Sequence, residues 1–265
     1  GVGTFSENSN SISVDGNGNT YITGCVQSPS ITFGTITLTH SDNTGRFNDI
    51  FIVKYSPLGN VLWAKSHGSG LNNDVAESIS TDTSGNVFIT GNFYSPTITF
   101  GTTILTNNGG YDIFLAKYDV SGNVLWAKSA GQFSADASCS VSTDASGNAF
   151  LTGYFYNSTL TFGTISITNA GWEDIFVVKY SPSGIVLWAK SIGGSGSEGG
   201  GSVSTDAIGN LFVSGYFQSS SITFGTTNLI SNGANDIFIA KYSPSGNVLW
   251  AKSAGGISND YETSL

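Results

Sequence analysis

Apolar and polar residues alternate over short stretches of this chain, and turn-forming residues separate the stretches. Residues 78–82 (SISTD) alternate, residues 83–86 suit a turn, and alternation resumes over 87–93 (VFITGNF). The segments 112–118 (DIFLAKY) and 123–129 (NVLWAKS) flank a second turn in the same way. A period of two is typical of strands, and no stretch combines a 3.6-residue period with helix caps. We therefore expect an all-β protein.

The turns between these stretches share one chemistry. In the pattern Asp82-x-x-Gly85-Asn86 the aspartate side chain accepts hydrogen bonds from the turn, and the glycine takes the positive-φ position of a hairpin. The segment 97–105 (TITFGTTIL) alternates around Gly101 and predicts a further, smaller hairpin. The pattern thus indicates a unit of four main strands with one extra hairpin.

The chain consists of four copies of this unit. The string VLWAKS places a tryptophan at positions 63, 126, 188 and 250, at successive spacings of 63, 62 and 62 residues. Self-similarity at such a period is the signature of a repeat architecture. We place the units at approximately 11–77, 78–139, 140–201 and 202–263, within a single repeat domain over residues 1–265.

Both faces of the middle strands are apolar. Phe51 and Val53 alternate with Ile50 and Ile52, so both faces need a cover, as happens when blades stack face to face around an axis. A sandwich or barrel would show one polar face, and a linear β-solenoid would need a shorter rung. The predicted fold is an all-β β-propeller of four ~62-residue repeats, each a four-stranded blade with an extra small hairpin.

The repeat resembles a known family. The unit D-x-x-G-N-x-F/Y-I-T-G … D-I-F-x-x-K-Y-S-P-x-G-N-V-L-W-A-K-S is similar to the SBBP β-propeller repeat of secreted bacterial proteins, and in layout to the NHL repeat. The likeness covers all four units, with Gly24, Gly91, Gly153 and Gly215 at the same place in each. It implies propeller blades and an extracellular or cell-surface location, and it transfers no catalytic residue.

Residues 240–250 also resemble the tryptophan-docking motif of quinoprotein dehydrogenase propellers. Ala240, Gly246 and Trp250 match that motif, whereas its Asp, Thr and Lys positions hold other residues. We interpret the likeness as a shared mode of blade packing, in which a tryptophan packs between neighbouring blades. A quinoprotein-like enzyme is kept as a distant alternative.

The two ends of the chain correspond to the same part of the repeat unit, so only one of them can occupy that position in a closed ring. Four complete units fit a closed four-bladed ring, yet the segments 1–10 and 254–265 overlap as equivalent parts of the unit. One alternative is a ring latched by one end. The others are a fragment of a longer repeat protein and an open array or filament in which each chain's end completes its neighbour.

Composition restricts the partners. Charged residues make up only 10% of the chain, against about 25% in an average domain, and the net charge is -9 with a single arginine. Such a chain lacks the basic patch that nucleic-acid binding requires. No apolar stretch approaches the ~20 residues of a membrane-spanning helix. We expect neither nucleic-acid binding nor a membrane span.

The excess negative charge concentrates in one part of the repeat. Eight repeat lysines cancel eight repeat aspartates, and most remaining acids lie in the connections that lead into the first strand of a unit. In a propeller these connections share one rim, where the repeats differ and where binding sites on repeat scaffolds lie. Trp172 belongs to the same rim, whereas the other four tryptophans pack between blades. The predicted ligand-binding residues are Asp74, Glu77, Asp136, Trp172, Glu173 and Glu198.

Calcium is a secondary possibility. Asp15, Asn17 and Asn19 resemble the first half of a calcium loop, but the other units keep only the Asp-x-x-Gly-Asn pattern of the hairpin turn. The acids of the rim are spread over separate units, whereas a calcium site needs several convergent oxygens. We therefore expect no metal site and no other cofactor.

Candidates for catalysis are scarce. His40 and His67 occur once each, without a paired serine or cysteine pattern, and are expected on the surface without a role. Cys25 and Cys139 belong to units one and three, and a disulfide needs Cα atoms within about 7 Å, so two free, partly buried thiols are expected. We predict that the protein is not an enzyme.

These observations favour a secreted or cell-surface, non-catalytic bacterial propeller that serves as a structural, adhesive or assembly module. Its expected partners are further copies of itself, other surface proteins or glycans. The alternative is a lectin-like propeller that binds glycans or peptides through the acidic rim.

Overall fold

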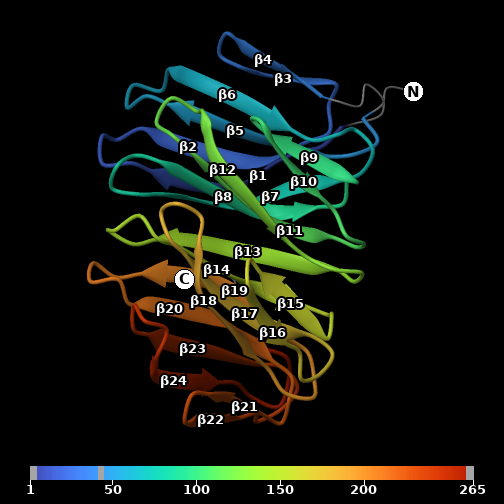
Figure 1. The fold of residues 1–265 in the computed structure, drawn as a ribbon, viewed down its shortest axis with the longest axis vertical. Helices are drawn as coiled ribbons and strands as arrows, with labels where there is room; N and C mark the ends of the chain where they lie inside the picture. The colour runs from blue at the N-terminus through green and yellow to red at the C-terminus, as the bar shows by residue number, and fades with distance from the viewer. Residues whose placement is uncertain (1–4, 41–44, 261–265) are drawn as a thin grey trace.

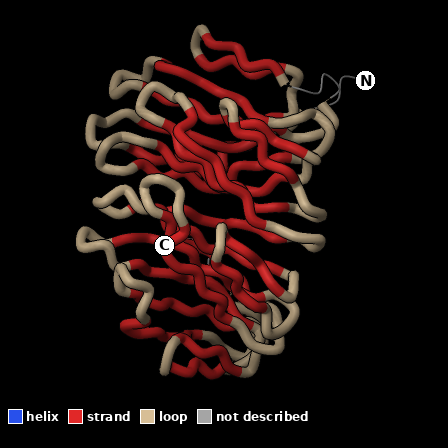
Figure 2. Tube along the Cα trace, viewed as in Figure 1, coloured by secondary structure: helices blue, strands red, loops and turns tan. Residues whose placement is uncertain are grey.

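The computed structural model describes residues 5–40 and 45–260, and this range folds entirely into strands, turns and loops (Figure 2). Each unit forms one antiparallel four-stranded sheet, which we call a blade. Blade 1 contains β1 (Glu7–Val14), β2 (Thr20–Val26), β5 (Asp49–Tyr55) and β6 (Val61–His67). Blade 2 contains β7 (Asp74–Thr81), β8 (Val87–Phe93), β11 (Asp112–Tyr118) and β12 (Val124–Ala130). Blade 3 contains β13 (Asp136–Thr143), β14 (Ala149–Phe155), β17 (Asp174–Tyr180) and β18 (Val186–Ile192). Blade 4 contains β19 (Glu198–Thr205), β20 (Leu211–Phe217), β23 (Asp236–Tyr242) and β24 (Val248–Ala254).

A two-stranded hairpin accompanies every blade, as the alternation around Gly101 predicts. The hairpins are β3 (Ser30–Phe33) with β4 (Ile36–Thr39), β9 (Thr97–Phe100) with β10 (Thr103–Thr106), β15 (Thr159–Phe162) with β16 (Ile165–Thr168), and β21 (Ser221–Phe224) with β22 (Thr227–Ile230). Each packs on the outer strand of its own blade, and the last three also contact the outer strand of the preceding blade. The prediction of four propeller-type blades with an extra hairpin is confirmed.

The apolar core lies between blades. One cluster joins Tyr21 and Ile52 of blade 1 to Ile89 of blade 2, and equivalent clusters fill the boundaries between blades 2 and 3 and between blades 3 and 4. We call these boundaries seams. Both faces of β5, β11 and β17 are buried, as the apolar pattern of Ile50 to Val53 predicts. Stacking of blades therefore supplies most of the hydrophobic burial.

The tryptophan of VLWAKS belongs to these seams. Trp63 stacks on Tyr118 of blade 2, with ring centroids 6.5 Å apart, and its Nε1 donates a 3.2 Å hydrogen bond to the Val120 carbonyl. Trp126 and Trp188 make the same contacts with the blade that follows them. The predicted packing of these tryptophans between blades is confirmed.

The four blades form an open arc. Their inner strands contact one another in the order β1, β7, β13 and β19, and no comparable contact joins β19 to β1 among the described residues. Figure 1 shows blade 1 (blue) and blade 4 (orange to red) at opposite ends of the longest axis. Of the alternatives left by the sequence, the closed four-bladed ring does not describe this structure. The overlapping segments 1–10 and 254–265 lie partly outside the described residues, which begin at 5 and end at 260.

The glycine that recurs in the second strand of each blade allows a close approach of two backbones. A Cβ on Gly91 would lie 2.0 Å from the carbonyl oxygen of Val75 on the inner strand. The register shifts by one residue at this place, between Ala76 and Ser78, and equivalent bulges occur in the other blades. Glycine is therefore required by sterics at this position.

Candidate interaction surface

The two rims of the arc are built differently. At one rim each blade has two tight turns, and at the other, the long-loop rim, longer connections lead into β7, β13 and β19. In the turn 82–86, Asp82 Oδ1 accepts hydrogen bonds from the Ser84 and Asn86 amides, and Gly85 has a φ of 77°. The predicted turn chemistry is confirmed, and it makes the tight-turn rim nearly uniform from blade to blade.

The candidate calcium residues lie in the first of these turns. Asp15 Oδ1 accepts the amides of Asn17 and Asn19, and Oδ2 accepts the Asn19 side-chain amide and the Tyr21 hydroxyl. The contacts with residues 17 and 19 are those of the hairpin turn in the other blades, whereas the Tyr21 contact is particular to blade 1. Within residues 5–40 and 45–260, no group of three or more His, Cys, Asp and Glu side chains is placed to hold a metal ion.

Three of the predicted binding acids are buried. Asp74, Asp136 and Glu198 are the first residues of inner strands, and each is fully shielded from solvent. Asp136 Oδ2 accepts hydrogen bonds from the Gln132 amide and the Asn157 side chain. The expectation that these acids decorate an exposed acidic rim is therefore wrong. Their carboxylates bind the ends of neighbouring loops and hold those loops in place.

Asp112 is a further buried acid, and it lies next to one of these carboxylates. The Asp136 amide donates to the carbonyl of Tyr111, which places Asp136 beside Asp112. Desolvation by burial raises the pKa of Asp112 to about 6 and that of Asp136 to about 7, and the negative charge of Asp112 contributes to the second shift. Burial likewise raises the pKa of Asp74 to about 6. Burial thus favours the protonated form of all three carboxyl groups relative to an exposed aspartate.

Glu77 is half-buried and lines a hollow of ≈ 220 Å³ together with Tyr111 and Tyr154. Its Oε2 lies 3.5 Å from the side-chain nitrogen of Asn10, and burial raises the pKa of this carboxyl group. A carboxylate beside two phenol rings suits an ammonium or guanidinium group, by charge and by cation–π attraction.

Glu173 is buried among tyrosines. Its Oε1 accepts a 3.2 Å hydrogen bond from the Tyr216 hydroxyl, and its carboxylate also pairs with Tyr156. Desolvation and the Glu173 charge raise the pKa values of both hydroxyls. The Tyr154 ring lies edge-on to Tyr156, at a centroid distance of 5.9 Å. Sequence reasoning selected Glu173 but missed the tyrosines, although a tyrosine follows the second strand of blades 2 and 3 where blades 1 and 4 have glutamine.

Several exposed aromatic side chains belong to connections of the long-loop rim. Trp172 is 76% exposed and Phe133 is 86% exposed, and Tyr94 and Tyr156 are exposed to a smaller degree. The Trp172 amide donates to the Gly196 carbonyl, so its loop is tied to the next connection. Isolated apolar side chains also project from the tight turns, but they are aliphatic, such as Leu58 and Ile208. Aromatic side chains are enriched in protein interfaces, so the long-loop rim is the candidate interaction surface.

Contrary to expectation, His40 is buried and His67 is partly buried, and both side chains have specific contacts. His40 is buried, with Nε2 3.7 Å from Asp49 Oδ1. His67 lies in the seam between blades 1 and 2, where Nδ1 is 2.9 Å from the Thr99 carbonyl and Nε2 is 2.8 Å from the Tyr118 hydroxyl. Desolvation lowers the pKa of His67 to about 4. Both side chains serve packing and hydrogen bonding inside the array.

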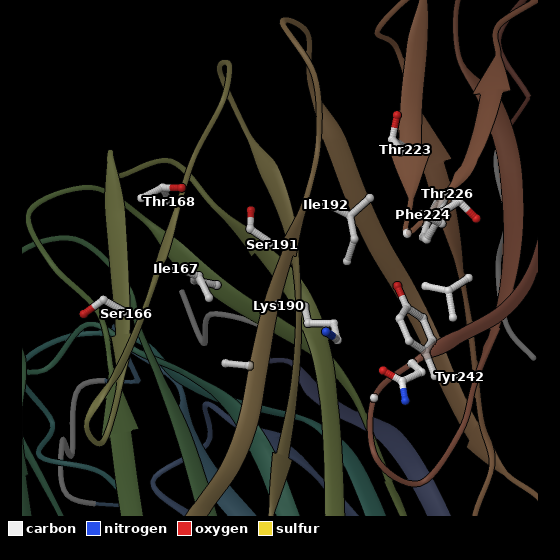
Figure 3. Close-up of a pocket in the computed structure, with 15 residues that line it drawn as sticks. Ser166, Ile167, Thr168, Lys190, Ser191, Ile192, Thr223, Phe224, Thr226 and Tyr242 are labelled. Carbon is white, nitrogen blue, oxygen red and sulfur yellow. The ribbon is translucent and has the colours of Figure 1, made fainter.

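The corresponding seam between blades 3 and 4 contains a hollow of ≈ 620 Å³ (Figure 3). Ile192 occupies the position that His67 has in the first seam. Consequently the buried Tyr242 hydroxyl, which points toward Ile192 and Phe224 in Figure 3, has no hydrogen-bond partner. Cys25 and Cys139 form no disulfide among the described residues, as expected, and Cys25 is buried whereas Cys139 is partly buried.

Comparisons with known proteins agree with a repeat of propeller type. No family model matches the chain. The chain is 30% identical over 235 residues to the uncharacterized WD repeat-containing protein L264 of Acanthamoeba polyphaga mimivirus, a match that covers 75% of this chain and 17% of that protein. The chain thus spans about a sixth of the length of this curated relative.

Among solved structures, the chain is similar to a protein of unknown function from Bacteroides caccae, with a TM-score of 0.38 and 11% identity. That alignment covers 96% of this chain and 85% of the other. Within the described residues no helix is long and apolar enough to cross a membrane. The resemblance to SBBP repeats stays a prediction. The four repeated four-stranded sheets, each with its hairpin, give the chain the repeat architecture of a β-propeller.

Proposed function

We propose that the protein is a non-catalytic interaction module whose long-loop rim binds a polypeptide partner. The observation that carries this proposal is the strong exposure of aromatic side chains on that rim, with Phe133 and Trp172 the most exposed of them. Large aromatic side chains are enriched in protein interfaces, and their exposure to solvent costs free energy that a partner would recover. The half-buried carboxylate of Glu77 adds a place for a basic side chain.

The partner's chemistry follows from this surface. Aromatic and aliphatic side chains of the partner would pack against Phe133 and Trp172, and a lysine or arginine would enter the hollow of Glu77. Glu173 supports the surface from beneath, because its carboxylate is engaged by tyrosine hydroxyls. A role as a structural, adhesive or assembly module outside the cell is part of this proposal, and its support is the resemblance to repeats of secreted bacterial proteins.

Selection from a random peptide library tests the proposal. We expect enriched peptides that combine a basic residue with aromatic or aliphatic neighbours. Replacing both rim aromatics (Phe133→Ser with Trp172→Ser) should reduce their binding at least about tenfold, the usual effect of removing interface hot spots. The matched control replaces two exposed side chains of the tight turns (Leu58→Ser with Ile208→Ser) and should leave binding unchanged.

Two results would count against this function. The first is a library without enrichment, and the second is equal binding by the rim variant and the control variant. A glycan array probed with the same proteins examines the lectin-like alternative. Glycan binding that depends on Trp172, without peptide enrichment, would replace the polypeptide partner by a carbohydrate.

A further inference from the structure

Every seam of the array joins a donor face to an acceptor face. The last strands of one blade present a tryptophan Nε1 and a lysine Nζ, and both donate to a single main-chain carbonyl in the tight turn of the next blade. The acceptors are the carbonyls of Val120, Pro182 and Pro244, which receive Lys54 with Trp63, Lys117 with Trp126, and Lys179 with Trp188 at 3.0–3.3 Å. The same pair of hydrogen bonds recurs at all three seams, so it shows which groups a donor face and an acceptor face bind.

Blade 4 presents a donor face that has no acceptor within residues 5–40 and 45–260. Trp250 is 37% exposed, and its Nε1 has no acceptor among the described residues, although the three equivalent tryptophans each have one. Lys241 stays close to Asp206, at 3.3 Å, and its ammonium lies 4.7 Å from the Phe212 ring centroid. The donors are thus held in the orientation that they have in the internal seams.

Blade 1 presents the complementary acceptor face. Ile12 is 63% exposed, whereas its equivalents Ile79, Val141 and Val203 are 5–6% exposed because a preceding blade covers them. Pro57 occupies the position of Val120, and its carbonyl accepts no hydrogen bond among the described residues. Tyr55 is only partly buried, whereas the equivalent Tyr118 is fully buried beneath a tryptophan.

We propose that the donor face of blade 4 binds the acceptor face of blade 1 in a second copy of this chain. Trp250 Nε1 and Lys241 Nζ of one copy donate to the Pro57 carbonyl of the other, Trp250 stacks on Tyr55, and Ile12 becomes covered. Because the two faces differ, the contact is heterologous and joins copies head to tail. The support is continuity with an interface that the chain itself builds three times.

The intermolecular seam is weaker than the internal ones in one respect. At the internal seams a threonine hydroxyl of one inner strand donates to a main-chain carbonyl of the preceding inner strand, as Thr81 does to Val14 and Thr143 does to Thr81. The equivalent residue on the acceptor face is Val14, which has no hydroxyl to donate. The seam between copies therefore lacks one repeated hydrogen bond, which favours reversible, concentration-dependent association.

Sedimentation velocity over a broad range of protein concentration tests this proposal. The average mass should rise with concentration, and Trp250→Ala or Ile12→Asp should each weaken association about tenfold or more. Ile208→Asp is the matched control, because Ile208 is exposed at a tight turn whose equivalents Ser84 and Ser146 stay exposed beside the internal seams, and it should associate like the parent. Unchanged thermal melting confirms that each variant is folded.

Mixing the two end-face variants distinguishes head-to-tail binding from a symmetric contact. The Ile12→Asp chain keeps its donor face and the Trp250→Ala chain keeps its acceptor face, so an equimolar mixture should form a dimer and nothing larger. A monomer at every concentration, equal association by all variants, or a mixture that stays monomeric would overturn the proposal. Peptide binding at the long-loop rim is unaffected by either variant, so this proposal and the proposed function fail independently.

Discussion

The indole Nε1 of Trp63 donates to the carbonyl of Val120, and this bond links the outer strand of one blade to a tight turn of the next. The same ring lies against Gly122, where a Cβ would come within 2.9 Å of it. The tryptophan is thus shared by two blades, and its removal affects the contact between them.

We expect Trp126→Ala to lower the free energy of unfolding by about 3 kcal/mol, since it opens a cavity in a seam and leaves the Pro182 carbonyl without its tryptophan donor. Trp250→Ala makes the same chemical change without a following blade and should cost less than about 1 kcal/mol in dilute protein. Urea denaturation measures both variants. Equal losses would show that the tryptophan stabilises its own blade instead.

Two tyrosines at equivalent positions should respond oppositely to loss of the hydroxyl. Tyr118→Phe removes a 2.8 Å hydrogen bond to His67 and should cost about 1–2 kcal/mol. Tyr242→Phe removes a buried hydroxyl that has no partner and should be neutral or stabilising by up to about 1 kcal/mol. Thermal melting of both variants suffices, and a larger loss for Tyr242→Phe would contradict this assignment.

Stability should fall as the pH rises between about 4 and 7. The pKa of Asp136 is raised from 3.8 to about 7, so the folded protein holds a proton that the unfolded chain releases in this range. The stabilisation is complete below the unfolded pKa and is lost as the pH passes the folded pKa. Melting temperatures across this range should decrease, and Asp136→Asn should flatten the profile.

The control for this pH dependence is Asp206→Asn. Asp206 is a turn residue whose pKa is lowered, chiefly by the hydrogen bond from Asn210, so its contribution has the opposite sign and appears only at acid pH. His67, whose pKa is lowered to about 4, contributes to the pH dependence of stability in the opposite direction to Asp136. This contribution is the same in the parent and in both variants, so it cancels when the profile of a variant is subtracted from that of the parent. An Asp136→Asn profile parallel to the parent's would refute the assignment.

Gly91→Ala should be severely destabilising, by about 3 kcal/mol or more, because the added Cβ meets a backbone oxygen that can move only if the bulge is lost. Gly16→Ala places a Cβ in open space at a position without positive φ and should change stability little. Denaturation midpoints compare the two. A tolerant Gly91→Ala variant would mean that the bulge can relax.

The features predicted correctly from the sequence are those that depend on residues close to one another along the chain or on the repeat spacing. Alternation located the strands, the Asp-x-x-Gly-Asn pattern located the tight turns, and the spacing of Trp63, Trp126, Trp188 and Trp250 predicted the seams. The burial of the acids was not predicted because their partners are distant along the chain. Asp74 binds Ser95, 21 residues later, and Asp136 binds Asn157. Their recurrence at the repeat spacing of 62 residues was a usable signal that they belong to the framework.

The open arc could not be predicted either. The angle between blades depends on how side chains from Tyr21 to Tyr118 fill a seam, and no local pattern encodes that angle. Exposure of Trp172 followed from its place outside the repeat positions. The tyrosines around Glu173 needed the structure, because Tyr156 and Tyr216 come from different blades.

The acceptor at each seam is a backbone carbonyl, carried by valine in one turn and by proline in two others. These hydrogen bonds therefore do not depend on the identity of the turn side chain. Genetic duplication or unequal recombination in steps of one whole unit would lengthen or shorten the array while every remaining junction stays intact. Growth in copy number is then an evolutionary path along which these backbone-directed hydrogen bonds need no compensating substitution.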